Sequence, residues 1–104
     1  MLLLGPIPFT GDPAHAEERV IMILQTAYFP SRTAFEPGDT LRFVNVSGQA
    51  HTVSSSEGIW TTGAIEHGDE ITLKVDASMA GRFHGKSQRL IEGRLDLART
   101  PLTR

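Results

Sequence analysis

Residues 35–45 read Phe35-Glu36-Pro37-Gly38-Asp39-Thr40-Leu41-Arg42-Phe43-Val44-Asn45, a turn followed by a strand. The Pro-Gly-Asp tripeptide is a strong turn signal, because proline presets the backbone angle and glycine permits a sharp reversal. After the turn, the apolar Leu41 and Phe43 alternate with the polar Thr40 and Arg42. A period of two is typical of a β-strand with one buried face and one exposed face.

The same pattern of turns and alternating strands continues towards the C-terminus. Turn signals recur at His67-Gly68-Asp69 and at Met79-Ala80-Gly81, and between them Ile71, Leu73 and Val75 alternate with polar residues. No segment carries an apolar face with helical periodicity over three turns. Short strands separated by frequent turns predict an all-β fold of the sandwich or barrel type.

A continuous apolar run, Val20–Leu24, precedes these strands. Periodicity alone does not assign such a run. It is compatible with a strand buried on both faces or with a short buried helix. Pro30 ends the segment that follows it.

Length and composition limit the classes of protein to which this chain can belong. The chain has 104 residues, which is enough for one domain. It has no cysteine, so disulfides, thiolate metal ligands and cysteine nucleophiles are excluded. The formal net charge of −2 gives no reason to expect nucleic acid as a partner. No stretch approaches the roughly 18 apolar residues that a membrane-spanning helix needs.

The N-terminus resembles the end of a secretory signal. Met1-Leu2-Leu3-Leu4 begins a short apolar run, and Ala14-His15-Ala16 is a small-x-small site just before the polar Glu17. This pattern predicts export to the periplasm with cleavage after Ala16. The alternative is an ordinary N-terminus with chance alanines. The predicted division of the chain is a signal remnant (1–16), one domain (17–98) and a C-terminal tail (99–104).

An ordered series of short segments resembles the cupredoxins, the family of small blue-copper proteins that includes the plastocyanin-like electron carriers. The matching segments are Phe29-Pro30, residues 35–45, His51-Thr52-Val53, Trp60–Glu70, Ala80–Phe83 and Gly93–Leu97. The resemblance implies a Greek-key β-sandwich of two antiparallel sheets. It also implies copper binding and electron transfer, with His51, six residues after Asn45, at the position of the first histidine ligand.

The segment that carries the other ligands departs from the family. Blue-copper sites need two imidazoles, a thiolate and a weak axial thioether. In this chain the corresponding loop, Gly85–Glu92, contains no Cys, His or Met. Counting forward from Gly81 puts Ser87 at the cysteine position, whereas counting back from Gly93 puts Gly85 there. Either count predicts a degenerate site without a thiolate.

His51 with His67 is the remaining candidate metal site, and copper is the candidate cofactor. The strand directions of the family place the His67 turn and the Gly85–Glu92 loop at the same end as His51. Glu66, Asp69 and Gln88 are then further candidate neighbours. His84 should point outwards, because it follows the core residue Phe83 on the same strand. The alternative is that His51 is a hydrogen-bonded loop histidine and His67 an ordinary turn residue.

Two functions remain open. The first is a cupredoxin-like periplasmic protein of the copper-binding and electron-transfer class, with a degenerate site. The second is a metal-free cupredoxin-fold module that binds another periplasmic protein, as an accessory subunit would. Lys86 and Arg89 could dock an acidic surface of such a partner, although a solvated charged loop is the alternative. We do not expect an enzyme, because no nucleophile elbow surrounds the cluster Ser54-Ser55-Ser56.

Overall fold

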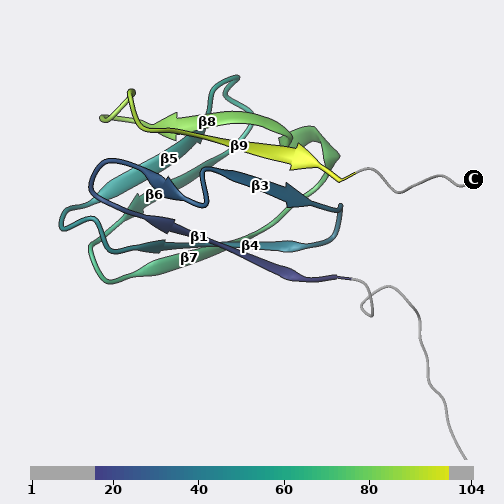
Figure 1. The fold of residues 1–104 in the computed structure, drawn as a ribbon, viewed down its shortest axis with the longest axis horizontal. Coiled ribbons are helices and arrows are strands. Elements are labelled where there is room, and N and C mark those ends of the chain that lie inside the picture. Colours follow the sequence, from purple (N-terminus) through teal and green to yellow (C-terminus); the bar gives the residue numbers. More distant parts are fainter. Residues whose placement is uncertain (1–15, 99–104) are drawn as a thin grey trace, which may run out of the picture.

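The computed structural model describes residues 16–98 and consists of two β-sheets packed face to face (Figure 1). The strands are β1 (Glu18–Ile23), β2 (Tyr28–Phe29), β3 (Arg32–Phe35), β4 (Thr40–Asn45), β5 (His51–Ser55), β6 (Thr61–Ile65), β7 (Glu70–Lys74), β8 (Gly81–Gly85) and β9 (Glu92–Leu97). One short 3-10 helix, η2 (Ala77–Met79), connects β7 to β8. None of the helices described between residues 16 and 98 has the length and apolar character to cross a membrane. The predicted tail and nearly all of the predicted signal remnant lie outside the described residues.

The sandwich predicted from the sequence is confirmed, but its sheets are mixed rather than purely antiparallel. One sheet has the order β2-β1-β4-β7 and the other β3-β9-β8-β5-β6. β1 pairs with β4 in parallel, and β3 pairs with β9 in parallel. Parallel neighbours need a crossover instead of a hairpin. The chain provides one by passing through β3, in the opposite sheet, on its way from β2 to β4.

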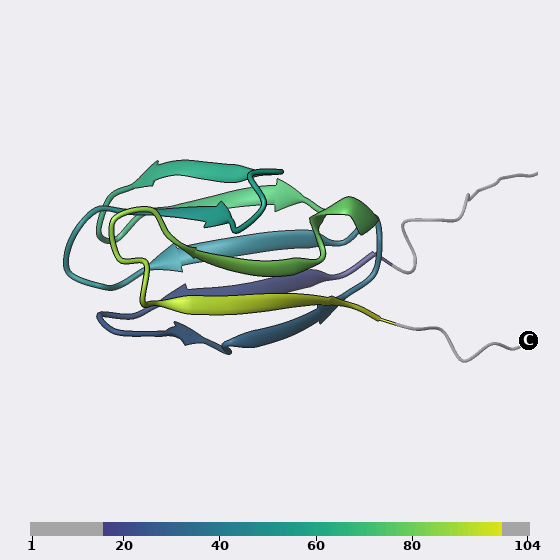
Figure 2. The ribbon, with the colours of Figure 1, turned by 90° about the horizontal axis from the view of Figure 1, so that it is seen from above.

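The two ends of the sandwich differ. The start of β1 and the end of β9 lie at the same end, as Figure 2 shows. Thr40, the first residue of β4, pairs with Glu18 and with Lys74 and therefore lies at this terminal end. The opposite end, which we call the rim, carries Asn45 at the close of β4 and His51 at the start of β5.

The core lies between the sheets and follows the predicted alternation. Its fully buried side chains include Leu41 and Phe43 of β4, with Val53, Phe83 and Leu95 from the facing sheet. The side chains of Ile71 and Leu73 are only partly buried, because β7 is an edge strand.

The apolar run Val20–Leu24 forms most of β1, so the helix alternative was wrong. Burial on both faces was also wrong. Ile21 and Ile23 are fully buried, whereas Val20 on the outer face is 39% exposed. β1 is therefore a half-buried strand whose outer face happens to be apolar.

A buried carboxylate fixes the turn that begins β4. Asp39 is fully buried. Its side chain accepts hydrogen bonds from the main-chain N–H groups of Glu36 and Glu17, at 2.9 Å each, and from Nε of Arg19 at 3.0 Å. Burial raises the pKa of Asp39, but these donors together outweigh burial and hold the pKa below its ordinary value.

We expect Asp39→Ala to lower the free energy of unfolding by about 3 kcal/mol, because it removes the buried carboxylate that accepts hydrogen bonds from three donors. Urea unfolding followed by Trp60 fluorescence measures the loss. Asp76→Ala is the control. Its carboxylate only caps η2 at the surface, through Ser78 N–H, so the loss should be about 1 kcal/mol. Equal losses in the two variants would contradict the role of Asp39.

Candidate functional site

His51 is held at the rim by a hydrogen bond between the two sheets. Its side chain is buried, and its Nε2 lies 2.9 Å from the hydroxyl of Tyr28. Tyr28 belongs to β2 in the four-stranded sheet, whereas His51 begins β5 in the five-stranded sheet. The Tyr28 ring also packs against Phe83, with ring centroids 4.8 Å apart. The imidazole is therefore fixed in orientation by a neighbouring aromatic side chain.

Gly85, the last residue of β8, lies directly against the His51 ring. A Cβ built on Gly85 would be 2.8 Å from both Cε1 and Nε2 of His51 and 3.1 Å from the carbonyl oxygen of Gln88. Of the two residues that counting put at the cysteine position, Gly85 is therefore the one in contact with His51. Ser87 is exposed to solvent. The position that faces the imidazole carries no side chain and has no room for one.

The loop after Gly85 is closed by its own backbone. Gly85 N–H donates to the carbonyl of Ile91 at 3.2 Å, and Ile91 N–H donates to the carbonyl of Gln88 at 3.0 Å. Lys86 N–H donates to the carbonyl of Thr52 at 2.8 Å, which ties the start of the loop to β5. The expectation that this loop lies beside His51 is confirmed.

Burial controls the ionisation of the Tyr28–His51 pair. It raises the pKa of the Tyr28 hydroxyl and lowers the pKa of His51. Both side chains are consequently neutral at pH 7. One of the two atoms donates the shared proton, and which one does so depends on the imidazole tautomer.

The side chains at the rim do not fit a blue-copper centre. That centre needs a thiolate, and the chain has no cysteine. Within residues 16–98, no group of three or more His, Asp or Glu side chains is arranged to hold a metal ion. The one imidazole at a family ligand position has its Nε2 engaged by Tyr28.

The other predicted site residues lie where strand direction placed them, but they have separate partners. Ile65 pairs with His51 across β5 and β6, so the turn that contains His67 is at the rim. His67 is exposed, and its Nδ1 accepts the main-chain N–H of Gly48 at 3.0 Å. His84 lies on the outer face of the sheet, as parity predicted.

Tyr28 was missed by the sequence analysis. The available signal was that Tyr28 is the one tyrosine of the chain and directly precedes the Phe29-Pro30 motif. A buried tyrosine usually finds a hydrogen-bond partner for its hydroxyl. Leu90 was also missed as a surface feature. It is 98% exposed, in the loop that follows Gly85.

We expect the stability of the protein to depend on pH through His51. Burial lowers the pKa of His51 from its ordinary value of 6.5, so the unfolded chain binds the proton more readily than the folded chain. Stability is then fully present above about pH 6.5 and falls as the pH drops from there towards the folded-state pKa. Urea unfolding at about pH 7.5 and about pH 5 measures this decline.

His51→Gln should reduce the loss of stability between about pH 7.5 and about pH 5. Tyr28→Phe should keep this loss, because burial and not the hydrogen bond lowers the pKa of His51. A decline of unchanged size in His51→Gln would contradict the assignment.

No family model matches the chain, and no curated protein matches it. Among solved structures, an amicyanin variant aligns with a TM-score of 0.67 and 18% identity over 86% of this chain and 86% of its own. A purple cupredoxin from Nitrosopumilus maritimus aligns with a TM-score of 0.67 and 14% identity, over 77% of this chain and 99% of its own.

A copper-containing nitrite reductase from Thermus scotoductus aligns with a TM-score of 0.67 and 12% identity over 79% of this chain. The alignment spans only 22% of the reductase. Identities this low establish the architecture and not the activity. They agree with the order of segments found in the sequence and with the two-sheet topology. The chain therefore has the cupredoxin fold.

Proposed function

We propose that this chain is a non-enzymatic, metal-free docking module of the periplasm, built on the cupredoxin fold. The observation that carries the proposal is that the His51 ring is hydrogen-bonded to Tyr28 and packed directly against Gly85. A neutral hydrogen-bonded pair takes up Nε2 of the histidine that stands at the family's first ligand position. The rim then presents a surface without redox chemistry of the blue-copper type.

The docking surface is the loop at the rim, which we call the rim loop (Lys86–Ile91). A hollow of about 450 Å³ is lined by Thr26, Ser87, Gln88, Arg89, Leu90 and Ile91. Leu90 stands almost fully exposed beside it. An apolar side chain with polar and charged neighbours is a typical arrangement for a protein interface. The cationic Lys86 and Arg89 favour a partner with an acidic edge.

Export to the periplasm is part of the proposal and is supported by the hydrogen bonds of Glu17. Its N–H donates to Oδ1 of Asp39, and its carbonyl accepts the N–H of Thr40 at 2.9 Å. The bound backbone thus includes the residue directly after the predicted cleavage site at Ala16. A mature chain that begins at Glu17 would lose none of these contacts.

We expect Arg89→Glu to reduce the recovery of a periplasmic partner at least fivefold, because it places a like charge against the partner's acidic edge. The measurement is affinity capture from periplasmic extract at matched salt, followed by photo-crosslinking from position 90 to identify the contact. Lys74→Glu is the matched control, since Lys74 lies at the terminal end of the sandwich. Equal recovery with both variants would refute docking at the rim loop.

A weak copper site that uses His51 and His67 is the second candidate function. The observation that favours it is that both histidines lie at the rim. His51 would bind through Nδ1 and donate from Nε2 to the Tyr28 oxygen, and His67 would have to release the N–H of Gly48. This candidate keeps the protein in copper handling but gives it no thiolate-based electron transfer.

Copper titration separates the two candidates. The docking module should bind Cu(II) and Cu(I) no tighter than about 1 µM, near −8 kcal/mol, and His67→Ala should change nothing. Tighter binding that disappears in both His67→Ala and His51→Gln would overturn the metal-free proposal. His67 is exposed, so its replacement should leave the fold intact. Neither outcome should include an intense visible thiolate band.

A further inference from the structure

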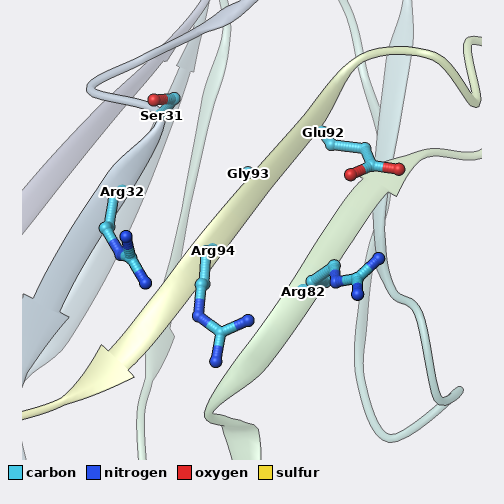
Figure 3. Close-up of a pocket in the computed structure, with 6 residues that line it drawn as sticks. All are labelled: Ser31, Arg32, Arg82, Glu92, Gly93 and Arg94. Atoms are coloured by element: carbon cyan, nitrogen blue, oxygen red, sulfur yellow. The ribbon is translucent and has the colours of Figure 1, made fainter.

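Three arginines form one row across the outer face of the five-stranded sheet. Arg32 of β3 pairs directly with Arg94 of β9, and Arg94 pairs directly with Arg82 of β8. All three are exposed, and the residues that follow them on their strands, Thr33, Phe83 and Leu95, are buried. In Figure 3 the three side chains come from adjacent strands, those of Arg32 and Arg94 extend in the same direction, and that of Arg82 extends to the side of β8 where Glu92 also reaches. We call this set the arginine row.

Such a row is unfavourable unless an anion compensates it. Neighbouring strands lie about 4.8 Å apart, so the outer two backbones of the row are roughly 10 Å apart. Like charges placed directly opposite one another across strands destabilise a sheet. Local rules of this kind are broken most often where a protein binds something.

The carboxylates of the chain compensate the row only in part. Asp96 accepts hydrogen bonds from Nε of both Arg32 and Arg94, and these contacts hold the pKa of Asp96 below its ordinary value. One carboxylate therefore serves two guanidinium groups, each through its Nε. Among residues 16–98, no carboxylate lies within ion-pair distance of Arg82, since none of the ion pairs of this part of the chain includes it.

A hollow of about 320 Å³ lies along the row. Its lining consists of Ser31, Arg32, Arg82, Glu92, Gly93 and Arg94. The main-chain N–H of Arg94 donates to the carbonyl of Ser31 at 2.8 Å, which fixes the Ser31 edge of the hollow. Glu92 is the one carboxylate of the lining, and in Figure 3 it extends over β8, away from Arg32.

We propose that the arginine row binds a soluble, multiply charged phosphate-class oxyanion, with two or more phosphoryl groups laid across β9 and β8. Planar guanidinium groups match phosphate oxygens and donate pairs of hydrogen bonds to them. Within residues 16–98, the terminal nitrogens of Arg94 and the guanidinium of Arg82 take part in no hydrogen bond or ion pair, which leaves them to donate to such a ligand. The length of the row favours a ligand with charges in series over a single ion. The site lies on a sheet face and is independent of the rim loop.

Inorganic pyrophosphate is the probe, at constant ionic strength, with binding followed by the NMR signals of the arginine Nε–H groups. We expect saturable shifts at Arg82 and Arg94 with Kd below about 1 mM in low salt. Arg82→Gln should weaken binding about three- to fivefold, the usual range for one exposed charge. Arg82 is exposed and has no ion pair with another residue of 16–98, so this variant should fold. Arg42→Gln, on the outer face of the other sheet, should stay within twofold of the wild type.

Equal weakening by Arg82→Gln and Arg42→Gln would overturn the proposal, because it would show attraction to overall charge alone. Absence of saturable shifts would overturn it as well. Vesicles that contain phosphatidylglycerol form the second arm of the experiment. Binding to these vesicles without a response to pyrophosphate would assign the row to a lipid headgroup and contradict a soluble ligand.

Discussion

The carboxylate of Asp39 is the interaction on which the rest of the sandwich depends. It joins three pieces of chain: the residue that precedes β1, the start of β1 through Arg19, and the turn that leads into β4. β1 and β4 are parallel neighbours, and no hairpin sets their register. A buried charge that needs all its donors allows one alignment of the two strands. The centre of the four-stranded sheet is built from that alignment.

Much of the fold could be predicted from the sequence because its signals are local. Alternation around Leu41 and Phe43, and turns rich in glycine and proline, identify strands and their faces without reference to the rest of the chain. The parallel pairs could not be predicted in this way. The contact between Arg32 and Arg94 joins residues far apart in sequence, and it depends on how the chain crosses between sheets. The prediction for β1 was wrong for a different reason. Val20 and Met22 make the run Val20–Leu24 continuously apolar, which hides the period of two.

The same distinction between local and long-range signals applies to the candidate site. His51 could be predicted because its position follows from spacing within segments that resemble one family, whereas the two counts along the loop left Gly85 and Ser87 as alternatives. Tyr28 could not, since its contact with His51 crosses from one sheet to the other. Whether a histidine at a ligand position is available to a metal depends on that contact. The sequence could identify the histidine, but the protonation and the partner of its ring are properties of packing.

The absence of a side chain at Gly85 limits which substitutions could convert this protein into a copper protein. A blue-copper centre needs a thiolate beside its imidazoles. Here the imidazole of His51 rests on the strand itself at Gly85. A thiol introduced at position 85 would meet the ring before it met any metal. Conversion to a blue-copper protein therefore requires the His51 ring to move and further ligands to be added, so a cysteine at position 85 alone is not enough.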